Sequence, residues 1–352
     1  MRKMATIRKI DSLRPIVGAD AIECAIVGGW TCVVKKGEYT AGDLAVYCEI
    51  DSFIPSTIAP FLTKPGQYAK TFEGVEGERL RTVKLRGQLS QGLLLPLEYN
   101  PSNTDEFAYF GTNGTVEFQF NEGTDVSELL GITKYEAPIP AALAGEVKGM
   151  FPSQIPKTDQ ERIQNLSVEL EEWKSQGLTW EVTEKLDGSS MTVYMIDGVA
   201  GVCSRNLDLK RNPDNSLWRA AIKHQLEEKL AGYGNIAIQG ELVGNGIQGN
   251  IYKMRDQDFY VYDVYDIDAG RYFTPADRKT FVQALDLLHC PVFKSDWMLT
   301  TESVADLLQR AEGKSVMGDI AGPEREGLVY KCNEKQLSFK AISNKFLMKH
   351  GD

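Results

Sequence analysis

The tetrapeptide that begins at Lys185 brings a lysine, an aspartate (Asp187) and a glycine (Gly188) to the end of a predicted strand. Alternate side chains of a strand project to the same side, so the Lys185 amine and the Asp187 carboxylate should lie together, while Gly188 permits a sharp turn. A lysine beside a carboxylate is either part of an ordinary ion pair or, once deprotonated, a nucleophile. Taken alone the pattern is weak, and a solvated surface turn is its commoner meaning.

Histidine is too scarce, and cysteine too widely spaced, to form other common catalytic or metal-binding sites. The three histidines, His224, His289 and His350, are expected to be surface or packing residues, which disfavours a Ser-His-Asp triad or a histidine-rich metal site. No two of the six cysteines have Cys-x-x-Cys spacing, which excludes zinc ribbons and thioredoxin-like redox sites, and we expect them to be reduced. Any chemistry must therefore use lysine, carboxylates or a hard metal ion.

Residues 244–249 match the dinucleotide-binding fingerprint Gly-x-Gly-x-x-Gly and follow a predicted strand. That fingerprint binds pyrophosphate only where a helix begins at the glycines. Residues 250–258 are short and polar and lead directly into another strand, which leaves no room for such a helix. We therefore predict a flexible loop here, not a dinucleotide site.

Length and composition indicate a globular protein of two domains. The chain has 352 residues, of which 42% are hydrophobic and 25% are charged. Its apolar runs are too short to span a bilayer, and residues 1–14 lack the apolar core of a signal peptide. We expect a cytoplasmic protein with no membrane partner.

Residues 1–130 predict an all-β domain. Short apolar runs alternate with glycines, a pattern typical of a small barrel or sandwich. Residues 101–128 are predicted to be rich in loops, and all of their charged side chains are acidic. The predicted strands are residues 22–27, 31–35, 43–50, 80–85 and 93–97.

Residues 131–352 predict an α+β domain with antiparallel sheet and helices packed outside it. A capping-box pattern at Thr158 and apolar residues at helical spacing predict a helix that ends at Gly177. Other helices are expected over residues 216–230, from Pro275 onward and over 302–312. Strands are expected at residues 180–185, 191–196, 199–203, 236–243, 259–267, 327–331 and 336–342.

The segments after Lys185 resemble, in order, the nucleotidyltransferase motifs of ATP-dependent ligases and capping enzymes. These segments are residues 204–206, 239–242, 259–263, 326–331 and 338–346. Residues 1–130, including 85–87 and 90–93, look like the OB module that RNA ligase family five carries in front of this set. The chain thus resembles a member of that family over nearly its whole length. The resemblance implies an OB-like RNA-binding barrel at 1–130 and a ligase-type nucleotidyltransferase domain, with ATP-grasp-like antiparallel sheets and flanking helices, at 131–352.

The resemblance also implies an activity. The Lys185 amine would attack the α-phosphorus of ATP, release pyrophosphate and form a lysyl–AMP phosphoramidate. AMP would pass to an RNA or DNA 5′-phosphate, and an RNA 3′-OH would then displace it and seal the strand, as in RNA repair. Because a protonated amine is a poor nucleophile, we expect partial burial and neighbouring cations to lower the pKa of Lys185.

Further roles follow from the resemblance. Asp187, Glu241 and Glu326 are hard oxygen ligands suited to Mg²⁺ or Mn²⁺. Arg205, Lys331 and Lys340 are the implied phosphate contacts, and these six residues with Lys185 form the implied catalytic set. The aromatic segment would stack Phe259 on the adenine, with Val261 and Asp263 on the same face and Tyr260 and Tyr262 pointing away. The residues implied to contact ATP or AMP are Glu184, Lys185, Gly188, Arg205, Glu241, Phe259, Glu326, Lys331, Lys340 and Lys345.

One position departs from the family pattern. Many relatives have a second lysine two residues after Lys340, where this chain has Ile342. Either Lys345 replaces it or one phosphate contact is missing.

Two other classes of function remain open. A GTP-dependent capping-type guanylyltransferase shares the lysine chemistry, but capping enzymes carry their OB domain after the catalytic domain. A non-catalytic nucleic-acid-binding protein with a degenerate pocket is disfavoured because Lys185, Asp187, Glu241, Glu326 and Lys340 are all present.

The net charge of −10 is unusual for a protein with an RNA partner, and its distribution is more informative. Acidic residues concentrate in 101–128 and 158–184, whereas basic residues gather in 79–86, 205–223 and 331–349. We expect a monomer that binds RNA 5′-phosphate and 3′-OH ends, including ends at nicks in duplexes. Its binding should weaken steeply with salt.

Overall fold

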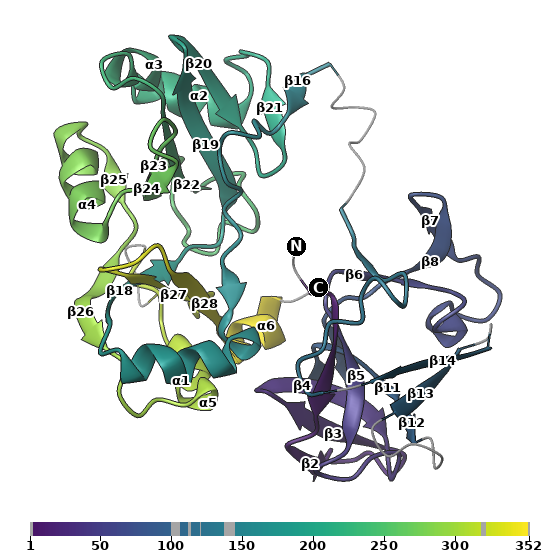
Figure 1. The fold of residues 1–352 in the computed structure, drawn as a ribbon. Helices are drawn as coiled ribbons and strands as arrows, with labels where there is room; N and C mark the ends of the chain where they lie inside the picture. Colours follow the sequence, from purple (N-terminus) through teal and green to yellow (C-terminus); the bar gives the residue numbers. More distant parts are fainter. Residues whose placement is uncertain are drawn as a thin grey trace. The chain divides into compact units, whose positions relative to one another are not determined.

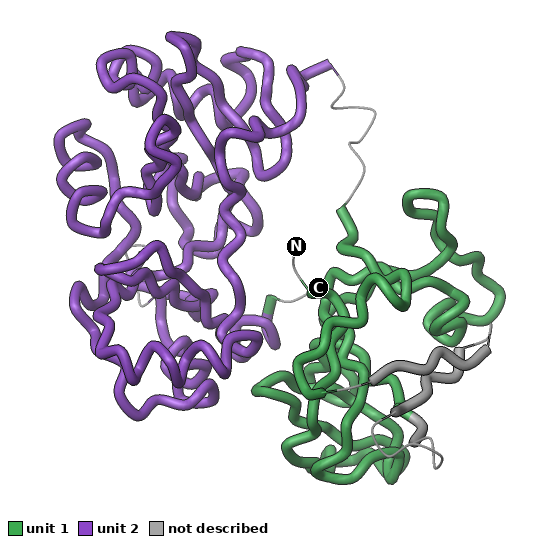
Figure 2. The backbone as a smooth tube through the Cα atoms, in the orientation of Figure 1, with its two compact units in different colours: residues 1–138, 350–352 green, residues 139–349 purple. Residues whose placement is uncertain are grey.

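The computed structural model of the chain describes residues 3–99, 106–111, 114–119, 121–136, 145–317 and 322–350. The chain divides into two compact units, residues 1–138 with 350–352 and residues 139–349 (Figure 2). Among the described helices, none is long and apolar enough to cross a membrane.

The first unit is built from strands, as predicted. Its described strands form several small antiparallel sheets and not one closed barrel. Buried apolar side chains, among them Ile7, Val46 and Ile54, fill the space between the sheets. The sheets are β1 (Ala5–Lys9), β5 (Leu44–Glu49) and β11 (Gly92–Pro96); β2 (Ser12–Pro15), β3 (Ile22–Val27) and β4 (Trp30–Lys35); β6 (Ser52–Pro55), β7 (Lys70–Phe72), β8 (Val75–Arg79) and β15 (Thr133–Lys134); β9 (Val83–Leu85) and β10 (Gln88–Ser90); and β12 (Glu98–Tyr99), β13 (Glu106–Gly111) and β14 (Gly114–Gln119).

Three expectations for this unit are corrected. The predicted strand at 80–85 forms only at its end, as β9, because β8 ends at Arg79 and residues 80–82 belong to no strand. The segment predicted to be loop-rich contains the paired strands β13 and β14, because its aromatic and β-branched residues favour strands despite its acidic charge. The boundary placed after residue 130 falls inside the unit, since β15 pairs with β6.

The second unit contains two mainly antiparallel sheets with helices on their outer faces (Figure 1). We refer to them as the larger and the smaller sheet. The larger sheet has the order β16 (Val147–Met150), β21 (Leu207–Leu209), β20 (Val199–Cys203), β19 (Ser189–Ile196), β22 (Ile236–Val243), β23 (Asp258–Asp266) and β24 (Arg271–Tyr272), with β25 (Leu288–His289) paired in parallel to β23. The smaller sheet has the order β17 (Glu161–Arg162), β28 (Ser338–Ile342), β27 (Gly327–Cys332), β18 (Thr179–Lys185) and β26 (Val292–Met298).

Each sheet has its own hydrophobic core. Trp218, Leu226 and Phe281 pack from helices onto the larger sheet, and Leu170 and Leu307 pack onto the smaller one. The opposite face of the larger sheet carries a second apolar cluster that includes Tyr194, Ala237 and Ile155. The helices are α1 (Ser167–Ser175), α2 (Ser216–Lys223), α3 (Leu226–Leu230), α4 (Pro275–Ala284), α5 (Val304–Ala311) and α6 (Asn344–His350).

Two predicted helices differ from the structure. The capping-box pattern at Thr158 does not start a helix: residues 161–162 form β17, which pairs in parallel with β28, and α1 begins only at Ser167. Edge pairing with the sheet has outweighed the local capping signal. The helix predicted over 216–230 is divided at Gln225, whose φ of 54° is left-handed.

The glycine-rich loop after β22 is confirmed as a loop. Described residues 244–257 contain turns and no helix, and the chain returns as β23 antiparallel to β22. A dinucleotide site would need a crossover helix at this point, so the fingerprint is a chance match.

Candidate active site

Lys185 is the last residue of β18, a central strand of the smaller sheet. Its register partner is Gly327 on β27, and Glu326 immediately precedes that strand. The Lys185 Nζ lies 2.7 Å from Glu326 Oε1 and 2.8 Å from Oε2. Two neighbouring strand ends therefore bring the predicted nucleophile and one predicted metal ligand together, with side chains that are 25% and 17% exposed.

Gly188 follows Lys185 where the chain passes to the larger sheet. A Cβ atom at Gly188 would lie 2.4 Å from the Leu242 carbonyl oxygen and 2.9 Å from Glu241 Cγ. Glycine is needed here for this close approach to β22, and not for an unusual φ. The same packing holds Glu241, the register partner of Ser190, beside the turn that contains Asp187.

The electrostatic surroundings of Lys185 differ from the prediction. Burial alone would lower the pKa of its amine, but the Glu326 and Glu241 carboxylates, with Asp187, outweigh burial and raise that pKa above its usual value. The expectation of neighbouring cations is wrong, because carboxylates surround this lysine. In the metal-free protein Lys185 is therefore charged.

The carboxylates are perturbed in turn. Burial and then the Glu326 charge raise the pKa of Asp187 to about 6. Burial raises the pKa of Glu241 to about 8, with Lys185 opposing and Glu326 adding to the shift. This site holds more negative charge than Lys185 neutralises, a donor set suited to a divalent cation. Among the described residues, no three His, Cys, Asp or Glu side chains form a preformed metal site. Here the Lys185 amine is the close partner of Glu326.

The aromatic strand is turned differently from the prediction. Phe259 is 0% exposed and belongs to the core between the larger sheet and its helices, so it has no face for a base. Tyr260 and Tyr262 instead contact the cluster that contains Leu186 next to Lys185. Phe259 thus lies on the core face of β23, away from Tyr260 and Tyr262.

Lys331 and Arg205 already have close partners. Lys331 Nζ lies 2.6 Å from Asp263 Oδ1 and donates to the Tyr262 carbonyl, and its side chain is 8% exposed. Burial lowers the pKa of Lys331. Arg205 is 61% exposed and pairs with Asp159 at 2.8 Å.

The last basic residues are also placed. Lys340 lies on β28 opposite Val329 of β27. Ile342 is 3% exposed and lies in the core. Lys345 is 65% exposed and pairs with Glu312 at 2.8 Å, so the structure does not bring it to the carboxylates around Lys185 as a substitute for the missing lysine.

Glu184 and Tyr252 line the site on the side of Leu186. Glu184 is 1% exposed, and its Oε2 accepts a hydrogen bond of 3.1 Å from the Val316 amide; burial raises its pKa. The Tyr252 hydroxyl accepts a hydrogen bond of 2.7 Å from the Asp187 amide. Tyr252 was not predicted, since nothing in the polar loop that carries it indicates that it returns to Lys185.

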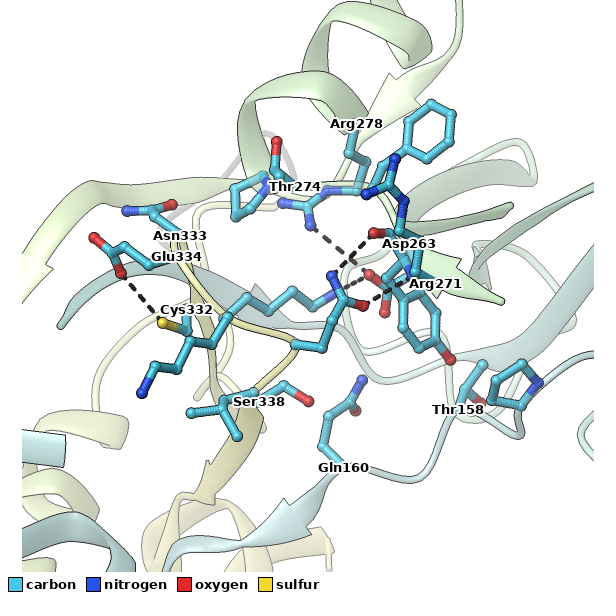
Figure 3. A pocket seen from close by; sticks show the side chains of 18 of the residues that line it. Thr158, Gln160, Asp263, Arg271, Thr274, Arg278, Cys332, Asn333, Glu334 and Ser338 are labelled. Atoms are coloured by element: carbon cyan, nitrogen blue, oxygen red, sulfur yellow. Dashed lines mark hydrogen bonds and ion pairs between the residues drawn. The ribbon is translucent and has the colours of Figure 1, made fainter. Parts of the chain in front are cut away.

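A cavity of about 460 Å³ in this unit is lined by Asp263, Arg278 and Lys331 and not by Lys185 (Figure 3). Arg278 is fully buried and pairs with Glu181, which is also fully buried. The sequence analysis missed both residues. One signal was available: Arg278 lies three residues before Phe281 and so on the inward face of α4.

Two antiparallel sheets that hold a strand-end lysine among carboxylates define a covalent nucleotidyltransferase of the ligase type, and comparison with known proteins gives the family. An OB-fold domain model matches residues 4–97, and an RNA ligase model matches residues 178–347. The chain belongs to the RNA ligase family, and its prediction as an ATP-dependent RNA ligase is confirmed.

Solved structures of the Naegleria gruberi RNA ligase are similar over the full length. A lysine-to-methionine variant with AMP and Mn is 45% identical, covers 99% of both chains and has a TM-score of 0.79. A structure of that ligase with pyrophosphate is 45% identical, with 99% of both chains covered and a TM-score of 0.77. A lysine-to-alanine variant with ATP and Mn gives 45%, 99% of both chains and 0.79. None of the curated proteins compared with the chain matches it.

Proposed function

We propose that Lys185 is the residue of this RNA ligase that accepts AMP from ATP. The observation that carries the proposal is the position of its amine, at a strand end among Asp187, Glu241 and Glu326. The reaction joins Lys185 Nζ to the α-phosphorus and releases pyrophosphate, and the proton leaves the amine. The Naegleria gruberi structures with ATP or AMP and Mn support ATP and a divalent cation as the corresponding ligands here.

Deprotonation of Lys185 is the step that the carboxylates control. With the amine charged and paired to Glu326, the metal-free protein is poorly poised to attack. A divalent cation held by Asp187, Glu241 and Glu326 would neutralise these carboxylates and supply positive charge beside the α-phosphate. The amine would then lose the partners that favour its charged form, and its pKa would fall.

The base and phosphate contacts are proposed from side chains near the Lys185 strand and from the basic residues that the resemblance implies. Tyr260 is the candidate for stacking on adenine, because it lies with Leu186 on this face. The buried Glu184 is the candidate for the polar edge of the base. Lys340 and Arg205 are proposed as phosphate contacts, Arg205 after exchanging Asp159 for phosphate. Lys331 is held by Asp263 and is assigned a supporting role.

RNA ends are the substrates of this enzyme class, and the finer specificity is proposed. We assign the 5′-phosphate end as the AMP acceptor and an RNA 3′-OH as the attacking group, with nicks in duplexes among the substrates and a monomer as the active form. Exposed basic side chains of the first unit support phosphate contacts there. They include Lys84 on β9 and Arg86 just after it. The salt dependence of binding tests this, because phosphate contacts release counterions and salt-independent binding would contradict them.

The decisive experiment incubates the full chain with α-labelled ATP or GTP and Mn²⁺. Label should transfer covalently to the wild type from ATP and should be absent in Lys185→Ala. Transfer from GTP alone would establish the capping-type alternative, and no transfer at all would leave only a binding protein. Retention of the label in Lys185→Ala would show that another residue is the nucleophile.

A further inference from the structure

The site around Lys185 is divided between two sheets. Lys185 and Glu326 belong to the smaller sheet, whereas Glu241 lies on β22 of the larger sheet. The spacing between the amine and Glu241 therefore depends on how the sheets are held together. The turn at residues 186–188 links them next to the site, and contacts farther along β18 set the position of the rest of that strand.

Arg278 on α4 contacts both sheets away from that turn. Its Nη2 pairs with Glu181 on β18, and its Nη1 lies 3.7 Å from Asp263 on β23. Arg278 and Glu181 are 0% exposed. One guanidinium thus spans the two strands, with a direct ion pair to Glu181 and a longer ion pair to Asp263 that is not a hydrogen bond.

Glu181 and Lys185 are four residues apart on β18, so their side chains project from the same face of that strand. Arg278 thus contacts β18 on the same face from which the Lys185 amine reaches the carboxylates. It acts on the strand that ends at the nucleophile, and not on a distant part of the fold.

Arg278 also fixes the segment that crosses between the sheets. Its Nε donates to Nε2 of His289 on β25 at 3.0 Å, and the Nδ1 of His289 lies 2.6 Å from the Cys290 carbonyl. Pro291 lies two residues after His289, and its carbonyl accepts a hydrogen bond of 2.9 Å from the amide of Glu184, the neighbour of Lys185. A second path thus leads from Arg278 to the site.

The charges in this group are balanced. The four buried members, Glu181, Arg278, Asp263 and Lys331, alternate in sign and balance one another, and Glu181 also pairs with the more exposed Lys279, whose Nζ lies 3.0 Å away. A buried ion network is a costly way to gain stability, and its attested use is to specify one arrangement over others. Figure 3 shows the ion pair between Arg278 and Asp263, both of which line the cavity.

We propose that Arg278 is a positioning residue for lysine adenylylation, which holds the Lys185 strand at the correct spacing from the sheet that carries Glu241. The proposal rests on the proposed function of Lys185. Arg278 touches no reacting atom, so its loss should slow the reaction of bound ATP more than it weakens ATP binding.

The test measures single-turnover formation of lysyl–AMP over a range of ATP concentrations in the full chain. Arg278→Gln should lower the rate constant by about 10- to 100-fold, as expected for a reacting group displaced by about 1 Å, with a much smaller change in half-saturating ATP. Arg278→Lys should recover part of the rate. The matched control is Lys279→Gln, which removes a partly exposed partner of the same Glu181 from the same helix and should stay near the wild-type rate.

The rate constant and the amplitude separate positioning from folding. A variant that is only less stable forms less adduct in total, at an unchanged rate constant, and that result would overturn the proposal. If Arg278→Gln does not fold, the same criterion applies to Arg278→Lys and to Glu181→Gln, which keep most of the packing. If the wild type forms no adduct, the proposed function is refuted. If the wild type reacts and the Arg278 variants react with the same rate constant, only the role of Arg278 is refuted.

Discussion

Lys185 and Lys331 lie on neighbouring strands of one sheet in opposite electrostatic surroundings. Glu326, Glu241 and Asp187 surround Lys185 and raise the pKa of its amine despite burial. Lys331 is buried with Asp263 while Arg278 approaches the same carboxylate, and burial lowers its pKa. The first group is short of positive charge and the second is balanced.

The difference indicates which of the two groups expects a ligand. An excess of buried carboxylates is unfavourable until a cation binds, and such an excess is typical of cation-binding sites. A balanced network needs no ligand and serves to hold strands together. Charge surplus, more than burial, therefore separates Lys185, our proposed nucleophile, from Lys331, to which we assign a supporting role.

The largest effect should come from removing each lysine in turn. Lys185→Met should abolish lysyl–AMP formation, a loss of at least about 1,000-fold, because no other side chain replaces the attacking amine. Lys331→Met should still form the adduct, at a reduced level set by its stability. Gel analysis with labelled ATP measures both. If Lys331→Met is fully folded but forms no adduct, Lys331 takes part in the chemistry, and the proposed difference in role between Lys185 and Lys331 is refuted.

Neutralising one carboxylate in each group should have opposite consequences. Glu326→Gln should slow adenylylation by about 100-fold, since it removes a predicted metal ligand, while costing the metal-free protein little stability. Asp263→Asn should cost about 3–5 kcal/mol of unfolding free energy, because it leaves two buried cations with one carboxylate. Denaturant unfolding and single-turnover kinetics test the pair. Equal stability losses in both variants would argue against a charge surplus at Lys185.

The stability of the metal-free protein should fall as pH rises from 5 to 8.5. Glu241 and Asp187 have folded pKa values raised to about 8 and about 6, so the folded state binds more protons than the unfolded state, and its stability is lost as pH rises through these values. A melting temperature lower by about 2–4 °C at the higher pH is expected, and Mn²⁺ should restore it. Glu241→Gln is the control and should show a flatter profile. A wild-type profile that is flat without metal would contradict the assigned pKa shifts.

The smallest effect should come from Lys345. Solvent screens its exposed pair with Glu312, and Lys345→Ala should change adenylylation by less than about twofold. Lys340→Ala, measured in the same assay, should reduce the rate far more. A large defect in Lys345→Ala would show that this side chain leaves Glu312 to contact phosphate when ATP binds.

The sequence supported the strands and the order of the motifs because period-two alternation and turn residues are local signals. β3, β20 and β22 have the predicted bounds, and α4 begins at Pro275 as expected. The surroundings of Lys185 were not predictable in the same way. Whether cations or carboxylates meet its amine depends on which strand ends are neighbours, and the sequence does not state that pairing.

Phe259 and Asp263 lie on opposite faces of β23 for a local reason. Strict alternation places Phe259 and Asp263 on one face, but β23 has a bulge where Gln239 pairs with Asp263 and Gly240 with Val261. The extra residue turns Asp263 toward Lys331 while Phe259 stays in the core. One inserted residue thus reverses the face on which every later side chain lies.

The segment before β18 has a practical consequence for shortened versions of the enzyme. Residues 156–162 are joined to both sheets: the Pro156 carbonyl accepts a hydrogen bond of 2.8 Å from Gln239 of β22, and β17 pairs with β28. Trp173 of α1 then stacks on Phe339 with a centroid distance of 5.7 Å. A catalytic fragment that began at residue 178 would expose the backbone edge of β28 and an aromatic cluster, and both invite aggregation. An active fragment should therefore start ahead of Pro156.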